Sequence, residues 1–201
     1  MSGSCDAFSC YCAENIINYT YTSKGGYYER ICQSLDYANE INHALEKGIL
    51  LTTKAGDQLN TMAIGWGMMG VQWNKPIFIA LVRGCRHTYQ LLDQNPEFTV
   101  NVPLEPLDKN IIRVCGTKSG RDTDKFQVLG LTTEEPDKIS VPGICQLPLT
   151  LECKVLYRQQ QYPEHMLSQE PFKFYKENPE SIQDDYHTAY YGEIVSAYII
   201  R

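Results

Sequence analysis

The sequence predicts a single mainly β domain, an antiparallel barrel with a few short helices. The expected strands are short and are separated by turn signals, which is typical of barrels. The strand pattern is clearest over 149–157, where apolar residues alternate with mostly polar ones. No internal repeat or low-complexity linker divides the 201 residues, and this length suits one domain with a sizeable core.

The first half of the expected domain follows from periodicity and turn residues. Apolar residues recur at helical spacing over 36–47, and Gly48 then marks the end of the expected helix. A strand over 49–53 leads into a hairpin turn over 55–58. Two further strands are expected in this half, over 62–67 and 77–82, with 73–76 as their connection.

The second half is expected to alternate short helices, strands and loops. Pro103 ends a strand over 98–102, and two prolines keep 127–143 irregular. The remaining expected elements are helices over 88–93 and 107–115, a loop with a short helix over 159–183, and a closing strand over 189–200.

The composition is that of an ordinary globular protein, with 43% apolar and 21% charged residues. The formal net charge of -6 argues against a nucleic-acid partner, because binding to a phosphate backbone needs a basic face. No apolar run approaches the ~20 residues that cross a bilayer. The N-terminus also lacks a basic region followed by an apolar one. We therefore expect a cytoplasmic protein without nucleic-acid or membrane partners.

Residues 1–34 are expected to form an N-terminal extension, and residues 35–201 the folded domain. The chain has eight cysteines, and disulfides are rare in the cytoplasm, so free thiols are expected. Cys5, Cys10 and Cys12 form C-x4-C-x-C, which lacks the C-x2-C pair typical of metal sites. We expect no metal site. The cluster is either a tail that carries thiols or part of a surface for a redox partner.

The stretch over 60–88 carries most of the candidate chemistry. Interior glycines often mark a bulge or a close approach of a ligand to the backbone. Arg86 offers a fork of donors and Thr88 a hydroxyl, which suit phosphate oxygens. If Thr88 opens a helix, free N–H groups and the helix dipole favour the same anion. The alternative is a glycine-rich barrel corner before a surface helix. The glycines concerned are Gly65, Gly67 and Gly70.

Several separated motifs resemble the flavin reductase-like family, the FMN-binding split barrels that include flavoredoxin-type proteins. The resemblance covers about residue 35 to the C-terminus, and its motifs occur in the family's order. It implies a split β-barrel, a Greek-key antiparallel barrel that is usually dimeric with flavin at the subunit interface. The motifs are Thr52-Thr53, Asn60-x-Met62 with Trp66, Pro76, Arg86-x-Thr88, Phe98-x-Val100-Asn101-x-Pro103 and Ser119-Gly120-x-Asp122-x-Asp124-Lys125-Phe126.

The resemblance also implies a set of cofactor-binding residues. The FMN phosphate would meet cationic and hydroxyl groups, and the flavin ring would lie on strand backbone with one tryptophan as a wall. The ribityl chain would meet hydroxyl and amide groups, and His187 would line the cavity. The implied phosphate residues are Arg86, His87, Thr88 and Lys125; the ring residues are Met62, Ala63, Ile64, Trp66 and Gly67; the ribityl residues are Thr61, Asn101 and Ser119.

The leading functional prediction is an NAD(P)H-dependent flavin reductase, which passes hydride from NADH or NADPH to FMN. Hydride transfer needs stacking and positioning, so the absence of a Ser-His-Asp or paired-carboxylate motif is consistent with it. The catalytic residues stay unassigned. One alternative is a flavoredoxin-like electron carrier reduced by a protein donor, and another is a flavin-binding protein without enzymatic activity. A homodimer and a redox partner protein are the expected partners.

Overall fold

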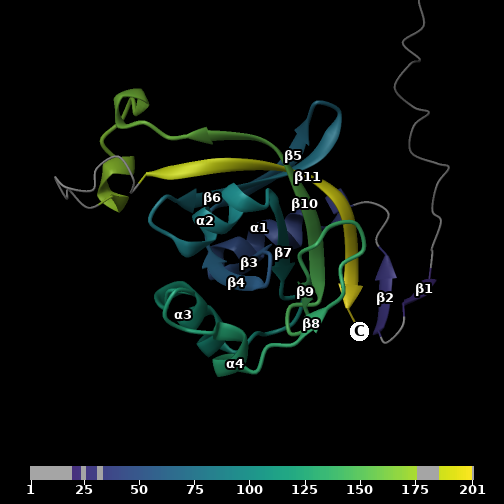
Figure 1. Ribbon diagram of the computed structural model, residues 1–201. Coiled ribbons are helices and arrows are strands. Elements are labelled where there is room, and N and C mark those ends of the chain that lie inside the picture. Colours follow the sequence, from purple (N-terminus) through teal and green to yellow (C-terminus); the bar gives the residue numbers. More distant parts are fainter. Residues whose placement is uncertain (1–19, 24–25, 31–33, 176–185, 201) are drawn as a thin grey trace, which may run out of the picture.

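Strand β11 (His187–Ile200) connects the two parts of the sheet (Figure 1). One of its edges pairs with β10 (Leu149–Gln160) along nearly its whole length. Its other edge pairs first with β6 (Lys75–Arg83) and then, near its end, with β2 (Gly26–Arg30). The computed structural model describes residues 20–23, 26–30, 34–175 and 186–200.

The strands form one antiparallel sheet that does not close on itself, in agreement with the split barrel expected from the sequence. Strand β5 (Gly67–Gln72) pairs with β6 as a hairpin. The chain thus leaves one part of the sheet at the end of β4 and enters the other at Gly67. The order across the main path is β1 (Thr20–Ser23), β2, β11, β10, β7 (Glu97–Val102), β3 (Ile49–Ala55) and β4 (Gln58–Ile64).

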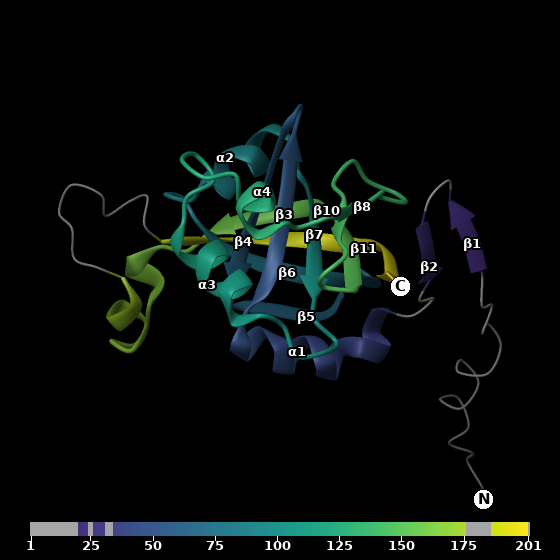
Figure 2. The ribbon, with the colours of Figure 1, turned by 90° about the horizontal axis from the view of Figure 1, so that it is seen from below.

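Short helices cover the strands on several sides. Figure 2 shows α1 and α2 on opposite sides of the strands, with α3 and α4 beside β3 and β4. Within the described ranges, no helix is long and apolar enough to cross a membrane. The helices are the 3-10 turn η1 (Ser34–Tyr37), α1 (Ala38–Lys47), α2 (His87–Gln94), α3 (Lys109–Thr117), α4 (Lys125–Leu129), η2 (Pro163–His165) and η3 (Pro171–Phe174); a separate two-stranded sheet consists of β8 (Thr133–Glu134) and β9 (Gly143–Ile144).

The core lies where the apolar faces of β3, β6, β7, β10 and β11 meet, and the side chains of Phe78, Phe98 and Tyr190 are almost fully buried in it. Gly192 shows how closely the strands pack. A Cβ at this position would lie 2.6 Å from a ring carbon of Phe98 and 2.8 Å from Cβ of Cys153. Only glycine allows this approach of β11 to the core.

Most elements expected from the sequence are confirmed. The expected helix over 36–47 is present as η1 and α1, and the turn over 55–58 is a two-residue hairpin loop in which Gly56 has φ +56. The single strand over 62–67 is wrong, because β4 ends at Ile64 and β5 begins at Gly67. Cys5, Cys10 and Cys12 lie outside the described residues.

The turn between β5 and β6 explains why β5 was missed. Trp73 and Asn74 both have positive φ, +53 and +57, and Gln72 pairs directly with Lys75. Such two-residue turns match the twist of a hairpin, and asparagine tolerates them well. The expected loop over 73–76 is therefore a tight hairpin turn. The region over 127–143, expected to be irregular, contains the end of α4 and strand β8.

Candidate functional site

Three cavities lie in sequence order along β4. The Trp66 cavity, of about 270 Å³, lies at the end of β4. The middle cavity, of about 140 Å³, lies between β4, the start of α2 and the loop after α3. The outer cavity, of about 620 Å³, lies between the β3–β4 turn and the residues over 120–126. Neighbouring cavities share lining residues, so together they form one groove, called here the β4 groove.

β4 is an edge strand, and this leaves peptide groups available to the groove. In the described sheet it pairs only with β3. A strand edge presents N–H and C=O groups that a second partner can meet. Lys125 is one such partner, since its Nζ donates to the carbonyl oxygen of Thr61 at 2.6 Å.

Lys125 is the centre of a junction between β4, α2 and α4. It is only 4% exposed, and its Nζ also lies 3.4 Å from Oδ1 of Asn60. The amide nitrogen of Asn60 donates in turn to the hydroxyl of Thr88 at 2.9 Å. A buried charge needs such partners to be tolerated. The junction fixes the start of α2 against β4.

Gly120 lets the loop before α4 approach this junction. A Cβ at this position would lie 2.0 Å from Oδ1 of Asn60 and 3.1 Å from Cδ2 of His87. Nδ1 of His87 is buried and has no hydrogen-bond partner among the residues that the structure describes. Buried polar atoms are nearly always paired in a folded protein. His87 lines the middle and outer cavities with other atoms of its side chain or backbone, and Nδ1 itself is closed off from them.

The electrostatics of the middle cavity favour an anion. Arg86 is exposed at the N-cap of α2, and the first turn of that helix holds no acidic residue. The first N–H groups of a helix have no partner within the helix, and the dipole attracts negative charge there. Burial, and then the charge of Arg86, lower the pKa of Lys125, while Cys115 opposes this shift. A bound anion would relieve the cost of keeping this lysine charged.

The thiol of Cys115, which neighbours Lys125, is expected to be unreactive. Burial raises the pKa of Cys115 to about 11, and the charge of Lys125 only partly offsets this shift. Reactivity requires the thiolate, which is scarce at neutral pH for such a group. The described residues also contain no group of three or more His, Cys, Asp or Glu side chains that could hold a metal ion.

Aromatic side chains form the wall of the Trp66 cavity. The ring of Trp66 lies 4.9 Å from that of His187 and meets Phe174 edge-on at 5.1 Å, measured between centroids. Nδ1 of His187 lies 2.8 Å from the hydroxyl of Tyr175, which donates to Oε1 of Gln161 at 3.0 Å. With the phenolic proton donated to Gln161, the hydroxyl oxygen of Tyr175 can accept from a protonated Nδ1 of His187.

Arg83 holds this aromatic wall to the end of β6. Its guanidinium lies 5.1 Å from the centroid of the Tyr175 ring and donates to the carbonyl oxygen of Phe174. A guanidinium over an aromatic face is attracted by the ring quadrupole. Phe174 and Tyr175, which follow β10, are thereby held beside the cavity.

The structure brings together ten of the twelve residues expected from the sequence. Thr61 lines the outer cavity, but its hydroxyl does not serve the site, because it donates to the carbonyl oxygen of Leu51 at 3.3 Å inside the sheet. The Trp66 cavity contains Met62, Ala63, Ile64, Trp66 and Arg86; the middle cavity contains Met62, Ala63, Arg86, His87, Thr88, Ser119 and Lys125; the outer cavity contains Thr61, His87 and Lys125.

Gly67 and Asn101 lie outside all three cavities. A Cβ at Gly67 would lie 2.9 Å from a ring carbon of Phe78, so this glycine serves packing within the β5–β6 hairpin. Asn101 is 0% exposed and donates to the hydroxyls of Thr52 at 3.0 Å and Thr99 at 3.1 Å. Its Oδ1 accepts from the Ile144 N–H at 2.9 Å. Asn101 thus joins strands in the sheet interior, and we leave it out of the proposed site.

Sequence reasoning gave no role to several residues of the groove. Asn60 and Gly120 stand inside the motifs quoted above, but only their contact shows that they shape the junction. Arg83 and Leu81 come from β6, which no motif connects to β4. Basic residues before α4 also went unassigned. These further lining residues of the middle cavity are Lys118 and Arg121.

Comparisons with known proteins agree with this architecture. The model of the family described as "Flavin reductase like domain" matches residues 46–201. An uncharacterized protein of Archaeoglobus fulgidus is 31% identical over 97 residues, which are 48% of this chain and 54% of the relative. The matched part of this chain thus spans about half of the length of that curated relative.

Solved structures show the same fold. A flavoredoxin from Methanosarcina acetivorans has a TM-score of 0.56 and 23% identity, covering 76% of this chain and 67% of that one. The FMN-binding domain of a flavin reductases-like enzyme from Shewanella baltica has a TM-score of 0.59 and 16% identity, covering 87% and 78%. An NADH:FAD oxidoreductase from Streptomyces globisporus has a TM-score of 0.54 and 18% identity, covering 75% and 73%. With the family match over most of its length, the chain belongs to the flavin reductase-like domain family.

Proposed function

We propose that the β4 groove binds FMN and that the protein is an NAD(P)H-dependent flavin reductase. The observation that carries the proposal is the junction of Lys125, Asn60 and Thr88 beside the buried Nδ1 of His87. It is a preformed, positively charged site one cavity away from an aromatic wall. A ligand with a dianion at one end and a flat ring at the other fits this arrangement, with the dianion in the middle cavity and the ring in the Trp66 cavity.

The phosphate is assigned to the middle cavity. Arg86 supplies a guanidinium fork, Lys125 a buried ammonium group, and α2 its N-terminus. Charge-assisted hydrogen bonds of this kind are about twice as strong as neutral ones. The hydroxyl of Ser119 adds a polar contact that a phosphate can use.

The flavin ring is assigned to the Trp66 cavity. The edge backbone of Met62, Ala63 and Ile64 lines it, and Trp66 with His187 forms a wall. N–H groups beside the ring favour its reduced, negatively charged form, which is how a protein tunes a flavin. When bound, FMN supplies the acceptor for a hydride from NADH or NADPH.

The chain's own residues would contribute positioning and protection in that reaction. Trp66 and His187 would cover one side of the cavity, with Phe174 packed against Trp66. The hydrogen bond between His187 and Tyr175 fixes the orientation of the imidazole. Orientation is the main requirement of hydride transfer, so no further acid or base is needed. Use of NAD(P)H would place the protein in the cytoplasm.

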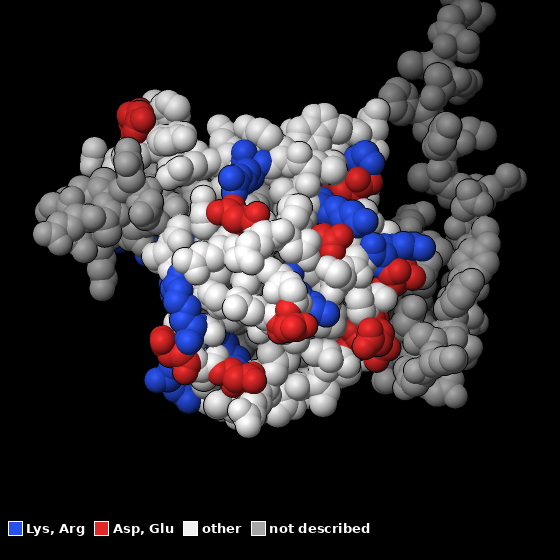
Figure 3. All heavy atoms as spheres, in the orientation of Figure 1, with Lys and Arg blue, Asp and Glu red and all other residues white. Residues whose placement is uncertain are grey.

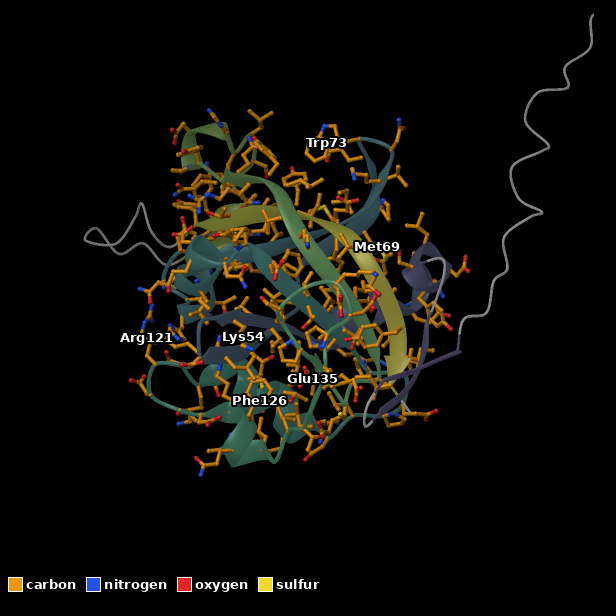
Figure 4. The ribbon with its side chains drawn as sticks, turned by 45° about the vertical axis from the view of Figure 1, so that its right-hand side comes forward. Lys54, Met69, Trp73, Arg121, Phe126 and Glu135 are labelled. Atoms are coloured by element: carbon orange, nitrogen blue, oxygen red, sulfur yellow. The ribbon has the colours of Figure 1, made fainter. Side chains whose placement is uncertain are left out.

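We also propose a homodimer formed through an exposed aromatic face. The rings of Trp73, Tyr157 and Tyr191 lie within 6.3 Å of one another between centroids, and Trp73 is 51% exposed. Figure 4 shows Trp73 at the tip of the β5–β6 hairpin, away from Arg121 and Phe126 of the outer cavity. Contiguous exposed apolar surface marks interaction sites. The face of the molecule drawn in Figure 3 carries acidic and basic side chains mixed together, with no large patch of a single charge.

The phosphate assignment is tested by comparing FMN with riboflavin, which lacks the phosphate. Arg86→Ala is expected to weaken FMN binding by about 1.5–3 kcal/mol, the usual cost of losing a charged hydrogen bond, and to leave riboflavin binding unchanged. Arg113→Ala is the matched control, because Arg113 is exposed on α3 and lies outside the three cavities. Titration by flavin fluorescence gives both affinities. Equal FMN affinity in the Arg86 variant and the wild type would overturn the assignment.

A further inference from the structure

Arg83 is a cation of the Trp66 cavity that phosphate binding does not require. Arg86 lines both the Trp66 cavity and the middle cavity, whereas Arg83 lines only the Trp66 cavity among the three. The proposed phosphate position lies in the middle cavity, so Arg83 belongs to the ring end of the groove. Among the described residues, the lining of the Trp66 cavity contains no carboxylate. The charge of Arg83 therefore needs a role of its own.

Strand geometry directs Arg83 to the cavity. Leu81 and Arg83 are two residues apart on β6, so their side chains leave the same face of the strand, and both line the cavity. Val82, between them, is fully buried in the core. Arg83 also pairs directly with His187 of β11, which lines the same cavity. Two neighbouring strands thus bring two side chains that can carry positive charge to one wall.

The segment after β10 restrains the guanidinium of Arg83. The guanidinium donates to the carbonyl oxygen of Phe174 and lies 5.1 Å from the centroid of the Tyr175 ring. Tyr175 is itself held, since its hydroxyl lies 2.8 Å from Nδ1 of His187. A charge that is already in place needs no reorganisation when an opposite charge develops beside it. The positive charge of Arg83 is thus preorganised at the cavity.

The redox state of a flavin decides what such a charge does. The oxidised ring is neutral. Hydride transfer brings two electrons and one proton, so it leaves the ring with one negative charge and the nicotinamide oxidised. A nearby cation attracts this reduced ring more strongly than the oxidised one. This difference in attraction raises the reduction potential of the bound flavin.

We propose that Arg83 sets the reduction potential of the bound flavin by stabilising its reduced, negatively charged ring. This inference rests on the proposed function, because it places the flavin ring in the Trp66 cavity. Arginine keeps its proton throughout the accessible pH range, so Arg83 balances the new charge without exchanging a proton. Phe174 and Tyr175 are positioning residues, since they act on the flavin through Arg83.

The test is the midpoint potential of bound FMN in the Arg83→Gln variant, measured at neutral pH by anaerobic reduction beside a redox dye of known potential. Glutamine removes the charge and keeps an amide N–H donor. Oxidised FMN is expected to bind with unchanged affinity, and reduced FMN about tenfold more weakly. This corresponds to a potential about 30 mV lower for a two-electron couple. If the glutamine variant does not fold, Arg83→Met, which keeps the apolar stem, takes its place.

Two further variants make the test specific to the charge of Arg83. Arg83→Lys keeps the positive charge and is expected to retain most of the wild-type potential. The matched control is Arg113→Gln, which removes a charge from exposed α3, outside the three cavities, and should leave the potential unchanged.

The outcomes separate this inference from the proposed function. An unchanged potential in Arg83→Gln overturns the role of Arg83 alone. An equal loss of affinity for oxidised and reduced FMN does the same, because a merely structural arginine affects both states alike. A potential that falls as far in Arg83→Lys as in Arg83→Gln contradicts the role of the charge. Failure of the wild type to bind FMN overturns the proposed function and this inference with it.

Discussion

Nζ of Lys125 lies 2.6 Å from the carbonyl oxygen of Thr61, on the free edge of β4. This contact places a buried cation at the boundary between the middle cavity and the outer cavity. It also explains why the lysine is tolerated there, since the carbonyl and the side chain of Asn60 replace part of its hydration. The charged ammonium group of Lys125 can thus attract an anionic ligand. The bound anion would lower the free-energy cost of keeping this buried group charged.

The first prediction concerns the pH dependence of FMN affinity. The pKa of Lys125 is lowered from its ordinary value of 10.5, chiefly by burial. As pH rises through this lowered pKa, the ammonium group loses its proton and its attraction for phosphate. FMN affinity should therefore fall as pH rises, and the decline should be centred below pH 10.5. Fluorescence titration at a series of pH values measures the decline.

Lys125→Arg is the control for this pH dependence, because arginine keeps its charge at every pH in the series. Its FMN affinity should show no decline over the same range. A decline of equal size in the arginine variant would assign the titration to another group. Thermal unfolding of the variant shows whether the larger side chain is accommodated.

The second prediction concerns Gly120. Gly120→Ala would place a Cβ 2.0 Å from Oδ1 of Asn60, so the junction with Thr88 and Lys125 must move. Overpacking of this kind costs about 1–3 kcal/mol of the free energy of unfolding, and FMN affinity should fall with it. Gly70→Ala is the matched control, since a Cβ there meets no atom within 4 Å. Wild-type affinity and stability in the Gly120 variant would show that the loop is free to shift.

The third prediction concerns Asn101. Asn101→Ala leaves the Ile144 N–H without a buried partner. The hydroxyls of Thr52 and Thr99 each lose the bond they accept from Asn101 but keep the ones they donate, to Thr61 and to the carbonyl oxygen of Pro142. Loss of these hydrogen bonds should lower the free energy of unfolding by roughly 2–4 kcal/mol, measured by urea denaturation. The FMN affinity of the folded protein should stay unchanged, because Asn101 lies outside the groove. Asn110→Ala, on exposed α3, should change neither quantity. Selective loss of FMN binding without loss of stability would return Asn101 to the ribityl role implied by the family resemblance.

The fourth prediction concerns the exposed aromatic face. Trp73→Asn removes the ring but keeps a residue that tolerates the φ of +53 at this turn position. If a second copy covers the face, light scattering should show a dimer for the wild type and a monomer for the variant. Leu167→Asn is the control, as Leu167 is an exposed apolar residue that lies on the β10–β11 connection and not on this face. A monomeric wild type, or a variant that remains dimeric, would contradict this face as the interface.

Local features of the fold could be predicted from the sequence, because neighbouring residues determine them. The β3–β4 hairpin follows from Gly56 and its neighbour at the turn, and α1 follows from apolar spacing. Strand β5 could not be predicted in this way. Its apolar run does not alternate, and Trp73 is an unusual residue at positive φ.

The candidate site shows the same limit. Asn60 and Asn101 both stand in family-like motifs, and nothing in either motif tells which one reaches the groove. The distinction comes from pairing between strands, which puts Asn101 in the sheet interior and Asn60 beside Lys125, 65 residues away in sequence. The aromatic wall of Trp66 and His187 likewise depends on the path of β11, which no local pattern specifies.

The most direct test of the proposed function is anaerobic reduction of the FMN-loaded protein. NADH or NADPH is added stoichiometrically, and the visible absorbance of bound flavin is followed over time. The proposal predicts that the flavin bands bleach rapidly with one of the two nucleotides and return when air is admitted. Flavin that stays oxidised with both nucleotides, but is reduced by a protein donor, would contradict the reductase proposal and favour an electron carrier.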